Sequence, residues 1–157
     1  MAIEKVKEYF KNFGKDKEIL EFPVSSATVE LAARALNTDG ARICKTLSFK
    51  TDEGCILVCA AGDARIDNKK FKAVFGLKAK MLSPDEVVTF TGHQIGGVCP
   101  FAIENDSVKV YCDNSLKRFT TVFPACGSAN SAIELTQDEL FKYSNSIDWV
   151  DVSKLPE

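Results

Sequence analysis

The sequence is poor in the residues on which most metal and redox sites depend. It has one histidine, His93, and its six cysteines include no Cys-x-x-Cys pair. Structural zinc sites take four cysteine or histidine ligands at short spacings, so we expect no metal and no cofactor. Cys55 and Cys59 lie in the apolar run CILVCA, where a reduced cysteine behaves as a small hydrophobe. We therefore expect buried free thiols rather than disulfides.

Long apolar runs and a surplus of positive charge are also missing. No run approaches the roughly 20 apolar residues of a membrane span, and residues 1–10 contain no apolar signal-peptide core. Twenty Lys and Arg against 22 Asp and Glu give a net charge of −2, which excludes a protein that coats nucleic acid through a wholly basic surface. We expect a cytoplasmic protein with no membrane partner, folded as one domain over residues 1–157.

Apolar periodicity and capping residues predict helices mixed with short strands. Ser25 and Ser26 are the expected N-caps of the second helix, and Gly76 is the expected end of the third. Because hairpin links occur without regular βαβ spacing, we predict an α+β fold, with a curved, largely antiparallel sheet or partial barrel packed by helices. The expected helices are 3–11, 27–37 and those opened by Asp67, Ser83 and Thr136; the expected strands are 18–22, 43–49, 55–60, 108–112, 119–123, 131–135 and 150–152.

Lys45 is a charged residue on an otherwise apolar strand face. Alternation along the strand puts it beside Leu47 and Phe49, the face expected to point inward. An ammonium group there is costly unless it is paired or lines a cleft that binds an anion or a carbonyl group. A lysine whose stem lies along the strand and whose head reaches water explains the same pattern, so the pattern alone leaves both open.

The segment 92–100 concentrates glycine and ends at Pro100. Such a backbone can present free amides to a carbonyl oxygen or a phosphate, although a simple tight turn is the commoner explanation. It matches neither the Walker loop nor the dinucleotide fingerprint. His93 and Cys99 share the segment, so a thiol–imidazole nucleophile is a further hypothesis.

Positive charge is concentrated in a different segment. Its members Arg65, Lys69, Lys70 and Lys72 form a candidate phosphate-contacting patch, although a solvated helix face would also explain them.

Several short motifs follow one another along the chain: 25–28 (SSAT), 41–47 (ARICKTL), 61–63 (AGD), 91–93 (TGH), 96–101 (GGVCPF), 113–116 (DNSL) and 125–128 (ACGS). In their order and spacing they resemble the YbaK / prolyl-tRNA-synthetase-associated editing domain family, over roughly residues 15–150. The resemblance implies a free-standing deacylase of mischarged aminoacyl-tRNA, in which water attacks the ester with help from a ribose hydroxyl of the substrate.

The resemblance also implies roles for individual residues. Lys45 matches the family's lysine, and the loop from Gly96 to Pro100 matches its Gly-x-x-x-Pro element; the two would hold the ester, with the amides of Gly96 and Gly97 receiving developing negative charge. Residues at family positions near the pocket are expected to contact substrate: Thr46, His93, Pro100, Asp113, Gly127 and Ser128.

The same resemblance implies tRNA as the partner, above all tRNA(Pro), with an aminoacyl-tRNA synthetase as a candidate partner. Residues 127–131 lack the basic residue of some cysteine-specific members, so the resemblance does not fix which small amino acid is removed. Two hypotheses of other classes stay open: a non-catalytic nucleic-acid-binding module with the same fold, and a small-molecule-binding domain.

Overall fold

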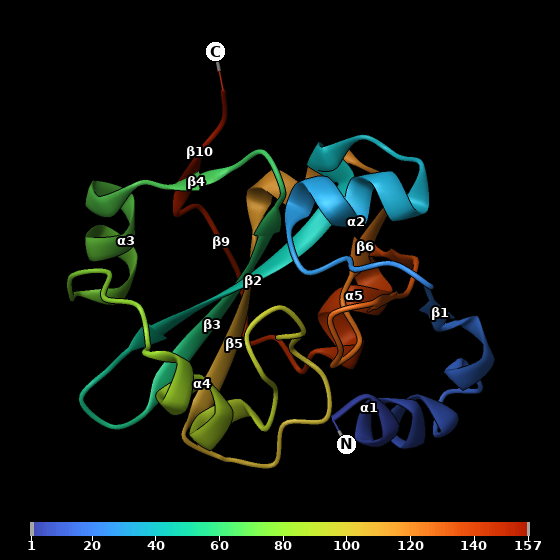
Figure 1. Cartoon of the computed structure of the whole chain (residues 1–157). Coiled ribbons are helices and arrows are strands. Elements are labelled where there is room, and N and C mark those ends of the chain that lie inside the picture. The colour runs from blue at the N-terminus through green and yellow to red at the C-terminus, as the bar shows by residue number, and fades with distance from the viewer. Residues whose placement is uncertain (1, 157) are drawn as a thin grey trace.

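The structure is a computed structural model that describes residues 2–156, within which the chain forms five α-helices, three 3₁₀ turns and ten short strands (Figure 1). The helical elements are α1 (Ala2–Lys11), η1 (Asp16–Glu18), α2 (Val29–Leu36), η2 (Gly40–Arg42), α3 (Asn68–Phe75), α4 (Pro84–Thr91), η3 (Asn114–Arg118) and α5 (Gln137–Tyr143). The strands are β1 (Leu20–Glu21), β2 (Ile43–Lys50), β3 (Cys55–Ala61), β4 (Arg65–Ile66), β5 (Val108–Asp113), β6 (Thr121–Pro124), β7 (Ser131–Ala132), β8 (Leu135–Thr136), β9 (Trp149–Val150) and β10 (Ser153–Lys154).

Six of the strands form one curled sheet in the order β8-β6-β2-β3-β5-β9 (Figure 1). The predicted hairpin is confirmed, because β2 and β3 pair antiparallel along seven residues. The α+β class and the curved sheet are confirmed as well. The sheet is more mixed than expected, since β2–β6, β3–β5 and β5–β9 are parallel pairs. Parallel neighbours need long crossover connections, and α3 and α4 lie in the connection between β3 and β5.

Both faces of β2 are covered. Cys44 faces the main core together with α1, α4 and α5, whereas Phe49 faces a second cluster around Phe71 of α3. A third cluster joins α2 to Ile43 and Phe123. The expectation that one face of β2 points inward was therefore too simple, because helices pack on both sides of the hairpin. No helix of residues 2–156 has the length and apolar composition needed to span a bilayer.

The helix starts follow the predicted capping residues with one exception. Asp67, Ser83 and Thr136 each cap the helix that was assigned to them, and the last two form complete capping boxes. The prediction for α2 was wrong: its N-cap is Thr28, whose side chain accepts from the Leu31 amide, and not Ser25 or Ser26.

Several strand predictions were too long. The strand expected at 18–22 is two residues after a 3₁₀ turn, and the one expected at 131–135 is split into β7 and β8. The last expected strand, 150–152, is replaced by β9 and β10, which pair with different neighbours. In each of these segments the chain passes from one pairing strand to another, and a local sequence pattern does not predict which strands will pair.

The C-terminal segment is held to the sheet by one buried carboxylate. Asp113 is fully buried and accepts hydrogen bonds from the Val152 amide at 3.0 Å, the Ser153 hydroxyl at 2.6 Å and the Ser115 amide at 2.9 Å. Hydrogen bonds to a charged acceptor are stronger than neutral ones. This carboxylate therefore fixes β10 beside β4.

We expect Asp113→Asn to lower the free energy of unfolding by about 1.5–3 kcal/mol, because an amide NH₂ would face a donor where the carboxylate now accepts. Urea denaturation measures this change as a lower midpoint. Asp106→Asn, at an exposed position, is the matched control and should leave the midpoint unchanged. An unchanged midpoint in Asp113→Asn would contradict the anchoring role.

Candidate active site

A cavity of about 340 Å³ opens where two neighbouring strands of the sheet diverge. β2 pairs with β6 at Ile43 and Cys44, while its pairing with β3 continues to Lys50. The space beyond Cys44 is lined by α2, which lies in front of the upper part of β2 in Figure 1, and by the loop that follows α4. The residues from β2 that line it are Ile43, Cys44, Lys45, Thr46 and Ser48.

Lys45 lies at the boundary of this cavity, with its ammonium group half-buried. Its Nζ donates to the carbonyl of Gly62 at 3.3 Å and to that of Ala64. An ammonium has three donors, so one N–H is left without a partner among residues 2–156. Burial lowers the pKa of Lys45, while Asp63 opposes that shift to a smaller degree. The side chain is thus a fixed positive charge with one donor still available.

Gly62 must be glycine for this arrangement. A Cβ at Gly62 would lie 2.1 Å from the carbonyl oxygen of Gly40 and 2.8 Å from Val29, so any side chain would push the turn away from α2. The neighbouring Asp63 is held by Arg118 through two hydrogen bonds, which lower the pKa of its carboxyl group. Asp63 is therefore engaged elsewhere and does not neutralise Lys45 at close range.

The glycine-rich loop supplies the opposite wall. Gly96 lines the cavity with a φ of +97°, and a Cβ there would lie 3.2 Å from the Cβ of Ala27. Gly97 differs from the prediction: it does not line this cavity, and its amide donates to the carbonyl of Gln94. The cavity-lining Gly96 and Val98 have amides without a backbone partner in residues 2–156.

Two buried hydroxyls in the cavity wall have no hydrogen-bond partner within residues 2–156. They belong to Thr46, a predicted substrate contact, and to Ser26, which is 8% exposed. Ser26 was predicted as an N-cap; because Thr28 takes that role, the Ser26 hydroxyl is left in the cavity wall. Unsatisfied buried hydroxyls are costly and mark a place where a ligand can donate or accept. Most of the remaining wall is apolar and includes Ala27, Ala32, Leu82, Ile95, Phe123 and Ala125.

His93 and Cys99 are in contact but do not reach the cavity. The Cys99 sulfur lies 3.5 Å from Nε2 of His93, while the same Nε2 lies 2.8 Å from the carbonyl of Phe101. Donating to that carbonyl leaves Nε2 unable to accept the thiol proton. Burial lowers the pKa of His93 and raises the pKa of Cys99 to about 12. His93 therefore braces the loop as a neutral ring, and its predicted substrate contact is not supported.

Four other predicted substrate contacts lie away from the cavity. Asp113 is the buried anchor described above, and Pro100 lines a different cavity beside α1. Gly127, with a φ of +88°, packs against the backbone of Ala2 and Ile3. The Ser128 hydroxyl donates to Asn130 and lies 2.7 Å from the Ser131 hydroxyl, and a Cβ at Gly97 would lie 2.7 Å from the Ser128 amide nitrogen. Gly127 and Ser128 thus support the loop from behind.

The predicted basic patch is divided by the structure. Lys70 is occupied, because its Nζ donates to Asp151 at 3.1 Å and to the carbonyl of Ser153 at 2.8 Å. Lys69 and Lys72 are exposed on α3 and line neither the 340 Å³ cavity nor the surface beside Lys45. Arg65 alone of the four lies next to Lys45.

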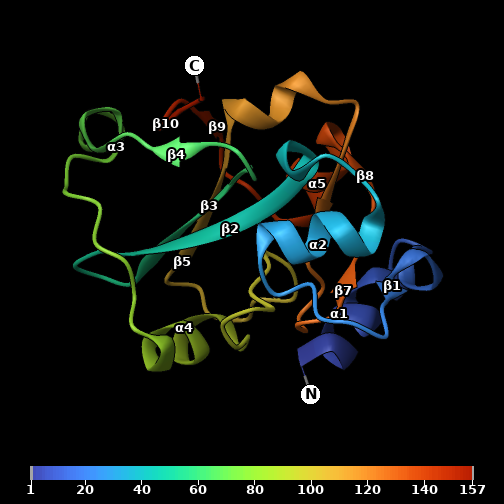
Figure 2. The ribbon, with the colours of Figure 1, turned by 45° about the horizontal axis from the view of Figure 1, so that its top comes forward.

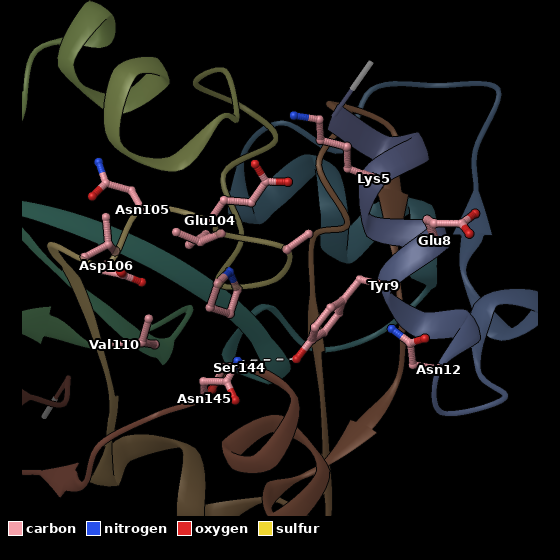
Figure 3. A pocket seen from close by; sticks show the side chains of 14 residues that line it. Lys5, Glu8, Tyr9, Asn12, Glu104, Asn105, Asp106, Val110, Ser144 and Asn145 are labelled. Carbon is pink, nitrogen blue, oxygen red and sulfur yellow. Dashed lines mark hydrogen bonds between the residues drawn. The ribbon is translucent and has the colours of Figure 1, made fainter.

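A larger cavity, of about 570 Å³, lies between α1 and the 102–108 loop (Figure 3). Asn145 there donates to the Tyr9 hydroxyl at 3.5 Å. Glu8, Glu104 and Asp106 line it, and a cavity lined by carboxylates repels a polyanion.

No cluster of three or more His, Cys, Asp or Glu side chains arranged to hold a metal ion occurs in residues 2–156.

The profile of the aminoacyl-tRNA editing domain matches residues 24–143, a range that contains every residue lining the 340 Å³ cavity. The chain belongs to the aminoacyl-tRNA editing domain family. Its resemblance to the YbaK / prolyl-tRNA-synthetase-associated group is confirmed, and its function lies in aminoacyl-tRNA editing.

Relatives include a free-standing chain and parts of synthetases. The protein is 54% identical over 155 residues to the uncharacterized protein YwhH of Bacillus subtilis, with 98% of both chains covered. It is 32% identical over 111 residues to the proline–tRNA ligase of Thermosipho melanesiensis and 26% identical over 143 residues to that of Bacillus cereus. These matches cover 70% and 89% of this chain but only 19% and 23% of the ligases.

Solved structures share the fold along the whole chain. One, described as a candidate trans-editing enzyme for prolyl-tRNA synthetase, has a TM-score of 0.87 and 26% identity, covering 98% of this chain and 97% of its own. Another, hypothetical protein APE2540, has a TM-score of 0.83 and 28% identity, covering 96% and 99%.

All six cysteines are buried, and burial raises the pKa of Cys55 to about 11 and that of Cys99 to about 12. Because the thiolate is the reactive form, we expect the native protein at pH 8 to react slowly with Ellman's reagent. Unfolding in guanidinium should make all six thiols accessible, so that all six react with the reagent. Rapid labelling of one native thiol, lost in Cys99→Ala, would restore the thiol-hydrolase hypothesis.

Proposed function

We propose that this protein is a trans-acting deacylase that hydrolyses the ester of a mischarged tRNA in the 340 Å³ cavity. The observation that carries this proposal is that one cavity brings together the ammonium of Lys45 and the Gly96 turn. A positive charge and free amides on opposite walls suit an ester whose carbonyl oxygen becomes negative during hydrolysis.

Among residues 2–156, no histidine, aspartate or glutamate lines this cavity, and its one thiol, Cys44, has no such partner there. The amine that lines it, Lys45, is assigned as a cationic donor, because the carbonyls of Gly62 and Ala64 accept from its ammonium group. A side-chain nucleophile needs an adjacent base or a lowered pKa. Direct attack by water on the carbonyl carbon is therefore the proposed step, with the neighbouring ribose hydroxyl of the substrate positioning the water through a hydrogen bond. The bond from the carbonyl carbon to the esterified ribose oxygen then breaks, and that oxygen leaves as a hydroxyl with the proton that the water gives up.

Lys45 and the loop have separate roles in this step. Lys45 uses its third N–H to hold the ester carbonyl or the adjacent ribose and phosphate oxygens. The amides of Gly96 and Val98 receive the negative charge of the tetrahedral intermediate, a role that Gly97 cannot fill because its amide is already bonded. Thr46 and Ser26 contact the amino acid or the ribose through their unpartnered hydroxyls.

The amino acid removed is a small one. The cavity of about 340 Å³ has to hold the aminoacyl group together with its ester and part of the terminal ribose, which favours a short amino-acid side chain. The proposed tRNA is tRNA(Pro), because the synthetase relatives are proline–tRNA ligases and one structural relative is described as acting for prolyl-tRNA synthetase. A non-catalytic tRNA-binding module is the alternative outcome.

We expect the wild type to deacylate tRNA(Pro) charged with alanine, serine or cysteine faster than correctly charged tRNA. A panel of charged tRNAs, each followed by the loss of labelled amino acid and corrected for uncatalysed hydrolysis, measures this. If the wild type binds tRNA but hydrolyses no member of the panel, the protein is a binding module and the proposed activity is wrong.

Lys45→Ala should lower kcat/KM for deacylation at least 100-fold, because it removes the fixed charge and leaves two carbonyls without their donor. Lys78→Ala, an exposed lysine outside the cavity, is the matched control and should retain full activity. Circular dichroism checks that both variants are folded. Undiminished turnover by folded Lys45→Ala would contradict the role of this residue.

Gly96→Ala should lower kcat/KM at least tenfold, because alanine does not adopt a φ of +97° and its Cβ would press on Ala27 inside the cavity. Gly92→Ala is the matched control: it has a φ of +76°, but its Cβ would meet nothing within 4 Å. We expect Gly92→Ala to cost about 1 kcal/mol of stability and to retain its activity. Equal losses of activity in the two variants would indicate a general strain effect instead of a specific one.

A further inference from the structure

A second cavity, of about 560 Å³, lies on the other side of Lys45 and shares that residue with the first. It is formed by the 62–65 turn and by the C-terminal residues Lys154 to Pro156. Figure 2 shows β4 and β10 side by side next to α3. The two cavities are therefore adjacent at Lys45, and the side of the second cavity next to Lys45 is called the exit below.

Two positive side chains oppose one another at this exit. Arg65 and Lys154 are direct partners in the antiparallel pair of β4 and β10, and both are exposed. Like charges directly opposite each other across two strands are destabilising, and Arg65 also acts to lower the pKa of Lys45. No hydrogen bond or ion pair to either side chain is found within residues 2–156, although Asp67 attracts Lys154 at longer range, so both side chains are available to bind an anion.

The nearby carboxylates are already engaged. Asp63, which lines the same cavity, is held by Arg118 at 3.0 Å, and Asp67 caps α3 through the Lys69 and Lys70 amides. Asp113 is not free either, since it anchors Val152 and Ser153 and thereby positions Lys154. The exit thus carries three cations, on Lys45, Arg65 and Lys154. In residues 2–156 no carboxylate forms an ion pair with any of them, and Asp63 and Asp67 attract Lys45 and Lys154 only at longer range.

We propose that Arg65 and Lys154 bind the phosphodiester backbone of the single-stranded 3′ end of tRNA, just upstream of the acylated nucleotide. Two cations on directly paired residues of neighbouring strands can contact neighbouring phosphates of a single strand whose acylated end lies in the first cavity. The identity of this nucleic acid rests on the proposed function, whereas the anion site rests on the geometry of β4 and β10. Arg65 is the member of the predicted patch that belongs to it, and Lys154 was not predicted.

The test measures the binding of fluorescently labelled, uncharged tRNA(Pro) by the full chain across a salt series, which needs no turnover. We expect the double variant Arg65→Gln/Lys154→Gln to raise Kd roughly tenfold at low salt. Removal of two phosphate contacts should reduce the slope of log Kd against log salt by about 1.4, at roughly 0.7 per contact on a single strand. Millimolar inorganic phosphate should compete weakly, because a free ion spans one contact and not two.

The matched control removes the same charge elsewhere. Lys69→Gln/Lys72→Gln, on α3, should leave both Kd and slope unchanged. Urea denaturation of the Arg65/Lys154 variant should show a midpoint no lower than the wild type, since a repulsive pair has been removed; this excludes misfolding as the cause of weaker binding. The proposed phosphodiester site is wrong if the slope of log Kd against log salt is unchanged in the Arg65/Lys154 variant, or if the Lys69/Lys72 control loses as much affinity as that variant.

Deacylation kinetics separate this proposal from the proposed function. In an active enzyme, the Arg65/Lys154 variant should raise KM with little change in kcat, as expected for uniform binding. An unchanged KM overturns the phosphodiester site and leaves the deacylase proposal intact. Binding that depends on Arg65 and Lys154, in a wild type that hydrolyses no charged tRNA, supports this site and overturns the deacylase.

Discussion

The divergence of β2 from β6 is the constraint on which the rest of the site depends. β2 is joined to β3 along seven residues, so its position is fixed from one side. On the other side, pairing with β6 stops after Ile43 and Cys44, and the sheet opens instead of closing. The free N–H and C=O groups of an unpaired strand edge must be covered by another part of the chain, or they can pair with another molecule. Here α2 and the loop after α4 enclose it, and the enclosed space becomes the cavity.

The second constraint is the charge that this opening holds. A half-buried ammonium is tolerated because the Gly62 and Ala64 carbonyls accept from it, and those carbonyls come close because Gly62 has no side chain to strike Gly40. Burial destabilises the charged form, and Arg65 adds to that effect. Asp63 offsets the positive charge where the two cavities meet only in part, because it acts at longer range. In the proposed mechanism, an incoming anion or a developing oxyanion would stabilise this charge further, which is the electrostatic arrangement that favours a transition state over a ground state.

Local sequence patterns predicted the elements well where the signal is local. The capping residues Asp67, Ser83 and Thr136 and the β2–β3 hairpin were correct, because each depends on contacts within a few residues. The Lys45 anomaly was also visible, since a charge on an apolar strand face needs no tertiary information to be noticed. Errors arose where distant segments decide the outcome. Asp113 resembled a substrate contact, yet its partners are Val152 and Ser153, about forty residues later, and Ser26 resembled a cap because its cavity is built by other segments.

By itself, the sequence determined that the chain is a globular α+β protein, that its cysteines lack the spacing of the usual metal sites, and that Lys45 and the glycine-rich segment are unusual. Only the tertiary structure decided which atoms of that segment can act. It turned Gly97 and His93 into supports, because the Gly97 amide and Nε2 of His93 donate to carbonyls nearby in the chain, and it left Gly96, Val98 and Ser26 in the cavity wall. It also placed Lys154 opposite Arg65. The physical reason is the same in each case: whether a polar group is available depends on whether the fold has already given it a partner, and that partner is usually far away in the sequence.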